Sequence, residues 1–268
     1  MRLSESGRFA LPALAAAAVL AALAAALWGL WTVMFTHNDQ YRIETVRITG
    51  DTSALTPEEI RSVSRIREGA NIFSSTAAAA RRRIVAASLN VEDARIRKRL
   101  PSEVDIEIVP RRPIARVLDG EFIRALDKDG LVFPILERDE EKYGMLPYLY
   151  DGVKTPRLPL GSRLRDVVGT PTETEGRLAR ALRLVRAVDE DPSCPVRIQE
   201  ADVSDRIYLA VQSTSGLAFR FVWEEIPDDA AIRRALDTAS LVLRHPGARQ
   251  MKSFDILLTP TNRVVASP

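Results

Sequence analysis

Histidine and cysteine are the residues best suited to metal binding and nucleophilic catalysis, and this sequence contains two histidines and one cysteine. His37 and His245 stand near opposite ends of the chain, and Cys194 lies between Pro192 and Pro195. A zinc site needs several Cys or His ligands at short spacings, and a hydrolytic triad needs a histidine beside its nucleophile. The sequence also lacks the common motifs of phosphate-binding proteins, metalloproteases and serine hydrolases. We therefore predict no catalytic residue, no metal ligand and no cofactor.

Two acidic pairs resemble catalytic carboxylates, but turns explain them more simply. Asp127 and Asp129 precede Gly130, and Asp202 and Asp205 flank a predicted hairpin connection. Asp side chains often bind their own backbone in turns, and Gly supplies backbone conformations that turns require. The lack of a recognisable active site favours a binding or scaffold role, although it does not by itself exclude catalysis.

The composition allows a membrane segment together with one or two globular domains. The chain has 268 residues, of which 46% are hydrophobic, and this is enough apolar material for such domains. Its 38 basic and 36 acidic residues leave a net charge of +2. This balance gives no reason to expect nucleic acid binding. The single cysteine excludes an intramolecular disulfide. Because no active-site motif is recognisable, we also expect no small-molecule substrate.

The apolar stretch near the N-terminus predicts a transmembrane helix. No charged residue occurs between Arg8 and Asp39, and about 20 apolar residues suffice to cross the hydrocarbon core of a bilayer. We assign the helix to Phe9 to Thr36. Arg2 and Arg8 precede it, so the positive-inside rule predicts a cytoplasmic tail at residues 1–8 and an exported C-terminal region. A cleaved signal peptide is the alternative, but its apolar core usually spans only about 7–15 residues.

Residues 41–110 are predicted to form a β-α-α-β-β domain. Thr56 and Glu59 have the spacing of a capping box, which indicates the start of a helix. The expected elements are a strand at Arg42–Thr49, a first helix from Thr56 to about Gly69, a second helix at Ser75–Ser88, and a terminal hairpin at Ala94–Ile108.

The hairpin carries a pattern that fixes its register. Hydrophobic residues alternate with basic residues before Leu100-Pro101-Ser102 and with acidic residues after it. A turn there produces the charged pairs Arg99–Glu103, Arg97–Asp105 and Arg95–Glu107, and the apolar pairs Ile96–Ile106 and Ala94–Ile108. A slip by one residue would oppose apolar and charged side chains. We interpret the charged face as solvated rather than as a binding patch.

A proline-rich segment, Pro110 to Pro113, separates this domain from residues 111–268. The second domain is predicted to be β-rich, with helices at Thr172–Val188 and Asp228–Leu243 whose apolar stripes face a core. Its expected strands are Ile114–Leu118, Phe122–Leu126, Val132–Pro134, Val196–Val203, Ile207–Gln212, Leu217–Val222, Phe254–Leu258 and Arg263–Ala266.

This organisation resembles the FtsQ/DivIB family of bacterial cell division proteins. The fold class that the resemblance implies is α+β, with one N-terminal transmembrane helix, a POTRA domain at 41–110 and an FtsQ-type β-domain at 111–268. The residues that carry the likeness are Val46-Arg47-Ile48-Thr49-Gly50, Gly69-Ala70-Asn71-Ile72-Phe73, Val91-Glu92-Asp93-Ala94-Arg95-Ile96, Leu100-Pro101, Arg112-Pro113-Ile114-Ala115, Leu126-Asp127-Lys128-Asp129-Gly130-Leu131-Val132-Phe133, Leu146-Pro147-Tyr148-Leu149 and Phe254-Asp255-Ile256-Leu257.

The resemblance implies a non-enzymatic scaffold of septum assembly that links early and late division proteins. Such a protein is expected in the inner membrane at the division septum, as a single-pass protein with periplasmic domains. Its β-domain is expected to bind an FtsB/FtsL-like partner by adding a strand to a sheet edge, because an exposed edge carries unpaired backbone groups. The residues expected at that edge are Phe254, Asp255, Ile256, Leu257, Leu258, Arg263, Val264 and Val265.

Two other functions remain open at this point. A POTRA-containing protein of outer-membrane assembly or secretion would usually carry several POTRA repeats or a C-terminal barrel, and no second β-α-α-β-β pattern is evident. A membrane-anchored envelope hydrolase would need an active site, for which the motif search gives no candidate.

Overall fold

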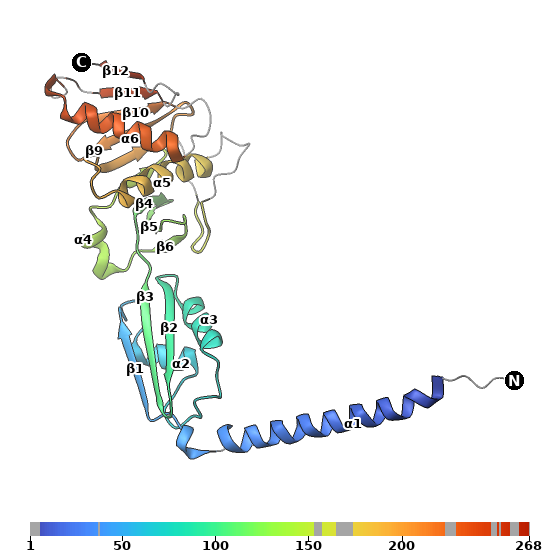
Figure 1. The fold of residues 1–268 in the computed structure, drawn as a ribbon. Helices are drawn as coiled ribbons and strands as arrows, with labels where there is room; N and C mark the ends of the chain where they lie inside the picture. Colours follow the sequence, from blue (N-terminus) through green and yellow to red (C-terminus); the bar gives the residue numbers. More distant parts are fainter. Residues whose placement is uncertain are drawn as a thin grey trace. The chain divides into compact units, whose positions relative to one another are not determined.

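The structure is a computed structural model that describes residues 6–36, 38–152, 157–164, 174–222, 229–247, 251, 253–257 and 263–267. The chain divides into two compact units, Met1–Pro110 and Arg111–Pro268. A single apolar helix comes first in the chain, and both helices and sheets follow it (Figure 1). The predicted α+β class is therefore confirmed. Residues 1–5 of the predicted tail lie outside the described residues.

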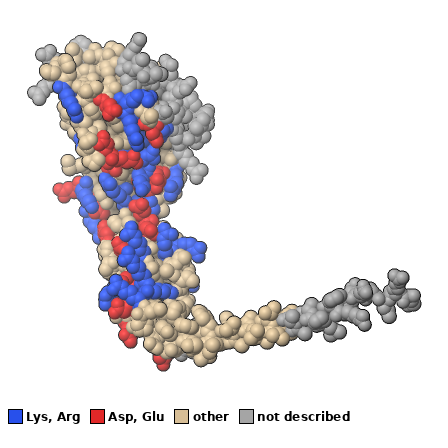
Figure 2. Space-filling view, viewed as in Figure 1, with Lys and Arg blue, Asp and Glu red and all other residues tan. Residues whose placement is uncertain are grey.

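The N-terminal helix α1 covers Ser6–Trp31 and continues as a π-helical turn, η1, at Thr32–Thr36. The window Ala17–Phe35 is long and apolar enough to cross a membrane. Its leucine and valine side chains are exposed all round. The window contains no charged residue, and the coloured part of the helix in Figure 2 is tan. A helix that is apolar on every side is suited to lipid rather than to water. The predicted span Phe9 to Thr36 lies within α1 and η1.

The remainder of the first unit is a three-stranded sheet with two helices. Its elements are β1 (Thr45–Gly50), α2 (Pro57–Ser64), α3 (Ala77–Ala87), β2 (Val91–Arg99) and β3 (Glu103–Pro110). The strand order is β1-β3-β2, with β1 parallel and β2 antiparallel to β3. The core is formed mainly by Ile60, Ile72, Ile84, Val91, Ala94, Val104, Ile106 and Ile108. The predicted order β-α-α-β-β is confirmed.

The first helix of this unit begins as predicted but ends early. Glu59 N–H donates to Thr56 Oγ1 at 3.3 Å, and Thr56 N–H donates to Glu59 Oε2 at 2.8 Å, which completes the capping box. The expected end near Gly69 is wrong, because α2 stops at Ser64. Arg65 follows with φ of 59°, a left-handed conformation that cannot continue an α-helix.

The predicted hairpin register is confirmed for all five predicted pairs of β2 and β3, and it shifts only between Val91 and Asp93. The ion pairs on its charged face differ in part from direct cross-strand pairing. Arg95 contacts Glu107 at 3.3 Å as predicted, but Arg99 reaches Asp105 at 2.7 Å and Glu103 instead contacts Arg47 of β1 at 3.3 Å. Long arginine side chains can reach diagonal neighbours, so a correct register does not fix the ionic partner.

The second unit is built on a nine-stranded sheet. Its strands are β4 (Ala115–Asp119), β5 (Phe122–Leu126), β6 (Val132–Pro134), β7 (Tyr148–Tyr150), β8 (Ile198–Asp202), β9 (Tyr208–Ser213), β10 (Ala218–Val222), β11 (Ser253–Leu257) and β12 (Arg263–Ser267). The order across the sheet is β12-β11-β10-β9-β8-β7-β4-β5-β6. Each of the eight predicted strands is present within two residues of its expected limits, and β7 was not predicted.

Helices α5 (Thr174–Glu190) and α6 (Asp229–Arg244) lie against the same face of this sheet (Figure 1). Their predicted apolar stripes are confirmed as core, because Leu178, Leu182, Val185, Ile232, Leu236 and Ala239 are buried. A short 3-10 turn, η3 (Glu137–Asp139), and a one-turn helix, α4 (Glu140–Tyr143), were not predicted. Thr172 and Asp228, the expected first residues of the two long helices, lie outside the described residues.

Candidate functional site

The outermost described strand at one end of the large sheet is β12. It pairs antiparallel with β11, in a register that places Val264 opposite Ile256 and Val265 opposite Asp255. Among the described strands, β11 is the only one that pairs with β12. Because successive residues of a strand direct their backbone groups to opposite sides, part of this edge carries N–H and C=O groups without a partner strand.

The structure divides the residues expected at the edge between two strands with different surroundings. Strand β11 lies inside the sheet, and Phe254 and Ile256 are only 4% and 0% exposed. Val264 and Val265 of β12 are 38% and 52% exposed. Leu257 and Arg263 pair with each other at the ends of their strands, and Leu258 lies outside the described residues. Val264 and Val265 are therefore accessible from outside, whereas Phe254 and Ile256 support the edge from within the core.

The two faces of the edge differ in polarity. Directly opposed residues of an antiparallel pair point to the same face, so Val264 lies on the same face as the buried Ile256. Val265 lies on the face of Asp255. On that face Asp255 accepts two hydrogen bonds from Arg220 of β10, at 2.5 and 2.9 Å. The edge thus has an apolar side next to the core and a charged side next to a bidentate ion pair.

Sequence reasoning missed Arg220 as a part of this site. Its guanidinium also lies 5.7 Å from the centroid of the Tyr208 ring. The sequence contains a signal for this ion pair. Arg220 stands between Phe219 and Phe221, and Asp255 likewise stands between two apolar residues. Charged residues in matching positions of two apolar strands indicate a cross-strand ion pair, but only if the strands are known to be neighbours.

Buried aromatic residues hold β11 in place. The rings of Phe219 and Phe254 stack with centroids 5.9 Å apart, and Phe221 lies 6.3 Å from Phe219. Ile232 and Leu236 of α6 belong to the same core. These contacts fix β11, the strand that pairs with β12, to the core of the second unit.

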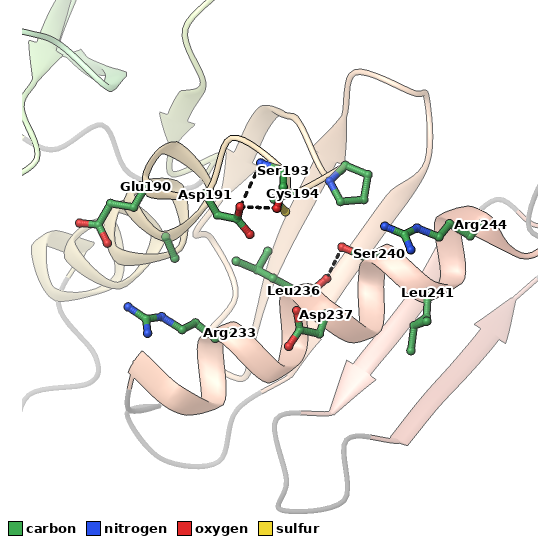
Figure 3. A pocket seen from close by; sticks show the side chains of 12 residues that line it. Glu190, Asp191, Ser193, Cys194, Arg233, Leu236, Asp237, Ser240, Leu241 and Arg244 are labelled. Carbon is green, nitrogen blue, oxygen red and sulfur yellow. Dashed lines mark hydrogen bonds between the residues drawn. The ribbon is translucent and has the colours of Figure 1, made fainter.

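A second candidate site is a hollow of about 570 Å³ between the end of α5, the loop that carries Cys194, and α6 (Figure 3). It brings together three carboxylates, two serine hydroxyls, two arginines and the buried thiol of Cys194. Asp191 accepts hydrogen bonds from Ser193 N–H at 2.9 Å and from Ser193 Oγ at 2.6 Å. The Ser193 hydroxyl and backbone bonds hold the pKa of the Asp191 carboxyl below its usual value, so it is a weak proton acceptor.

The geometry of this hollow does not suit the chemistry that its residue types suggest. Ser193 donates its proton to a carboxylate with a lowered pKa, and Cys194 has no histidine beside it among the lining residues. No group of His, Cys, Asp and Glu side chains that could hold a metal ion occurs in the described part of the chain. The edge strand β12 is therefore the stronger candidate for a functional site.

Comparisons with known proteins support the resemblance indicated by the sequence. Residues 41–111 match the family model of the FtsQ-type POTRA domain. The chain is also similar to cell division protein FtsQ of Streptomyces venezuelae, with 24% identity over 166 residues. That alignment covers 61% of this chain and 59% of the relative. The chain therefore matches somewhat more than half of the length of that relative.

Proposed function

We propose that this FtsQ/DivIB-family protein is a non-enzymatic scaffold of cell division whose edge strand β12 binds an FtsB/FtsL-like membrane partner. The observation that carries the proposal is the edge of β12 that pairs with no described strand, next to a buried aromatic core. Similarity to a cell division protein supports the process in which it acts. The proposed location is the inner membrane at the septum, with α1 as the single span, the N-terminus in the cytoplasm, and the POTRA domain and β-domain in the periplasm.

Strand addition accounts for part of the binding energy. The five residues of β12 can form about four to six backbone hydrogen bonds with an added strand. Each such bond contributes a net of about 1 kcal/mol, whereas micromolar affinity requires about 8 kcal/mol. The backbone alone is therefore insufficient, and we expect side chains to supply the difference.

Val264 and Val265 are the side chains placed to do so. Burying a valine that was exposed contributes about 1.5–3 kcal/mol, and these two are already partly covered. An apolar partner residue would lie beside Val264. At the start of β12, Arg263 is proposed to pair with an acidic residue of the partner, so Arg263→Glu should weaken binding more at low salt than at high salt.

The edge assignment can be tested with two neighbouring proline substitutions, Val264→Pro and Val265→Pro. Adjacent residues direct their N–H groups to opposite sides of β12, so one substitution removes a donor from the partner and the other removes a donor from β11. We expect one variant to lose co-purification with the FtsB/FtsL-like partner while its melting temperature stays near that of the wild type. The other variant should melt earlier. If both variants retain the partner, β12 is not its binding site.

The proposed location has its own test. A fluorescent fusion of the full chain should concentrate at the septum of dividing cells. A uniform distribution through the envelope during division would contradict the division role.

A further inference from the structure

We propose that the tip of the β2–β3 hairpin, Leu100 and Pro101, lies in the headgroup region of the membrane that α1 spans. The POTRA domain would then contact the bilayer at a second place beside the span. This inference rests on α1 as a transmembrane helix and is independent of the partner proposed for β12.

The end of the apolar helix is tied directly to a loop of the POTRA domain. Asn71 Nδ2 donates a hydrogen bond to the Phe35 carbonyl at 2.8 Å. The Phe35 ring lies 5.6 Å from Tyr41 and 5.6 Å from Phe73, and those two rings are 5.3 Å apart. Phe35 is the last residue of the apolar window Ala17–Phe35. The loop that carries Asn71 and Phe73 is therefore within one side-chain length of the point at which the chain leaves the hydrocarbon.

The hairpin turn lies at the same end of the domain. Glu44 N–H donates to the Ser102 carbonyl at 2.8 Å, three residues after Tyr41. From the other side, Lys98 Nζ donates to the Ile72 carbonyl at 2.5 Å. These bonds join the turn to both segments that contact Phe35. The turn is therefore held near the membrane surface by the same contacts that hold the domain to the span.

The composition of the tip suits a lipid interface. Leu100 is 61% exposed, and Pro101 is also exposed, although turns usually carry polar residues that bind their own backbone. Arg99 directly precedes the tip, Arg47 contacts Glu103 just after it, and Arg42 lies two residues before Glu44, which binds Ser102. More than half of each arginine side chain is exposed. Arginine can bury its aliphatic stem in an apolar layer while its charged group stays among the phosphates.

The charges at this end indicate insertion rather than attraction to acidic lipid. Each of the three arginines has a carboxylate partner, namely Asp39 at 2.7 Å, Glu103 at 3.3 Å and Asp105 at 2.7 Å. The net charge of the tip is therefore small. We expect its membrane contact to depend on Leu100 and only weakly on the fraction of anionic phospholipid.

A depth measurement on the full chain tests the inference. Leu100→Cys, in a Cys194→Ala background, would carry an environment-sensitive NBD label after reconstitution into phosphatidylcholine–phosphatidylglycerol vesicles. The matched control is Glu92→Cys, because Glu92 is exposed in β2, which ends next to Leu100, and eight residues of extended chain place it about 26 Å from the tip. We expect blue-shifted emission and quenching by brominated lipid at position 100, and neither at position 92.

Three results would overturn the inference. The first is a label at position 100 that is as hydrated as the label at position 92, in vesicles where carbonate-resistant association shows that α1 has inserted. The second is shielding of position 100 only after the FtsB/FtsL-like partner is added, which would make the tip a protein contact. The third is a steep rise of quenching with the phosphatidylglycerol fraction, which would replace insertion by electrostatic adsorption.

Discussion

Replacing Asp151 by alanine would remove one partner of an ion pair that is buried in the second unit. The Asp151 side chain is 0% exposed, and its Oδ2 lies 2.7 Å from Arg177 Nη2. Arg177 Nε also donates to the Val203 carbonyl at 2.6 Å. Removal of one partner of a buried pair costs about 3–5 kcal/mol, because the other charge loses an interaction that offset its burial. The bond to Val203 remains, so we expect about 3 kcal/mol, the lower limit of that range.

The measurement is denaturant-induced unfolding of the full chain in detergent micelles. The matched control is Asp189→Ala, which breaks the pair of Asp189 with Arg112 at 2.8 Å, where the Arg112 side chain is 74% exposed. Exposed pairs contribute about 0–1 kcal/mol, because solvent screens both charges. An equally small loss of unfolding free energy in both variants would refute the claim that burial makes the Asp151–Arg177 pair important.

Three further substitutions test the core, a helix cap and an ion pair. Phe254→Ala should lower the unfolding free energy by about 3–5 kcal/mol, because it leaves a cavity under β11, and calorimetry that shows no change would contradict the core assignment. Thr56→Ala should cost about 1 kcal/mol through loss of the helix cap, and Thr56→Ser, measured in the same denaturation series, should recover most of it. The pKa of Asp93 is lowered chiefly by the hydrogen bond from Arg81, so its carboxylate stabilises the fold above about pH 4 and loses this effect as pH falls through the folded-state pKa. Asp93→Asn should therefore destabilise the protein at neutral pH and lose this effect once the pH falls below the folded-state pKa, and an equal effect at neutral and acid pH would show that the charge is not responsible.

The features predicted best from the sequence are those that depend on neighbours in the chain. The capping box needs only Thr56 and Glu59, and the hairpin register needs only the two alternating runs beside Leu100. Strand β7 was missed, because its three residues become a strand only between β4 and β8, which are distant in sequence. The ion pair of Arg220 with Asp255 was missed for the same reason, since their strands are parallel neighbours joined by a long connection that contains α6.

The candidate site depends both on residues that are neighbours in the chain and on strands that are neighbours only in the sheet. The residues expected to bind a partner therefore divide into contact residues and supporting residues. The sequence identified the last two strands but could not show which of them is outermost. Because β11 is internal, substitutions at Phe254 or Ile256 should reduce partner binding and thermal stability together. Substitutions at Val264 or Val265 that keep the strand should reduce binding alone, because these side chains are partly exposed. Loss of binding without loss of stability is therefore the property that distinguishes a contact residue from a supporting residue at this edge.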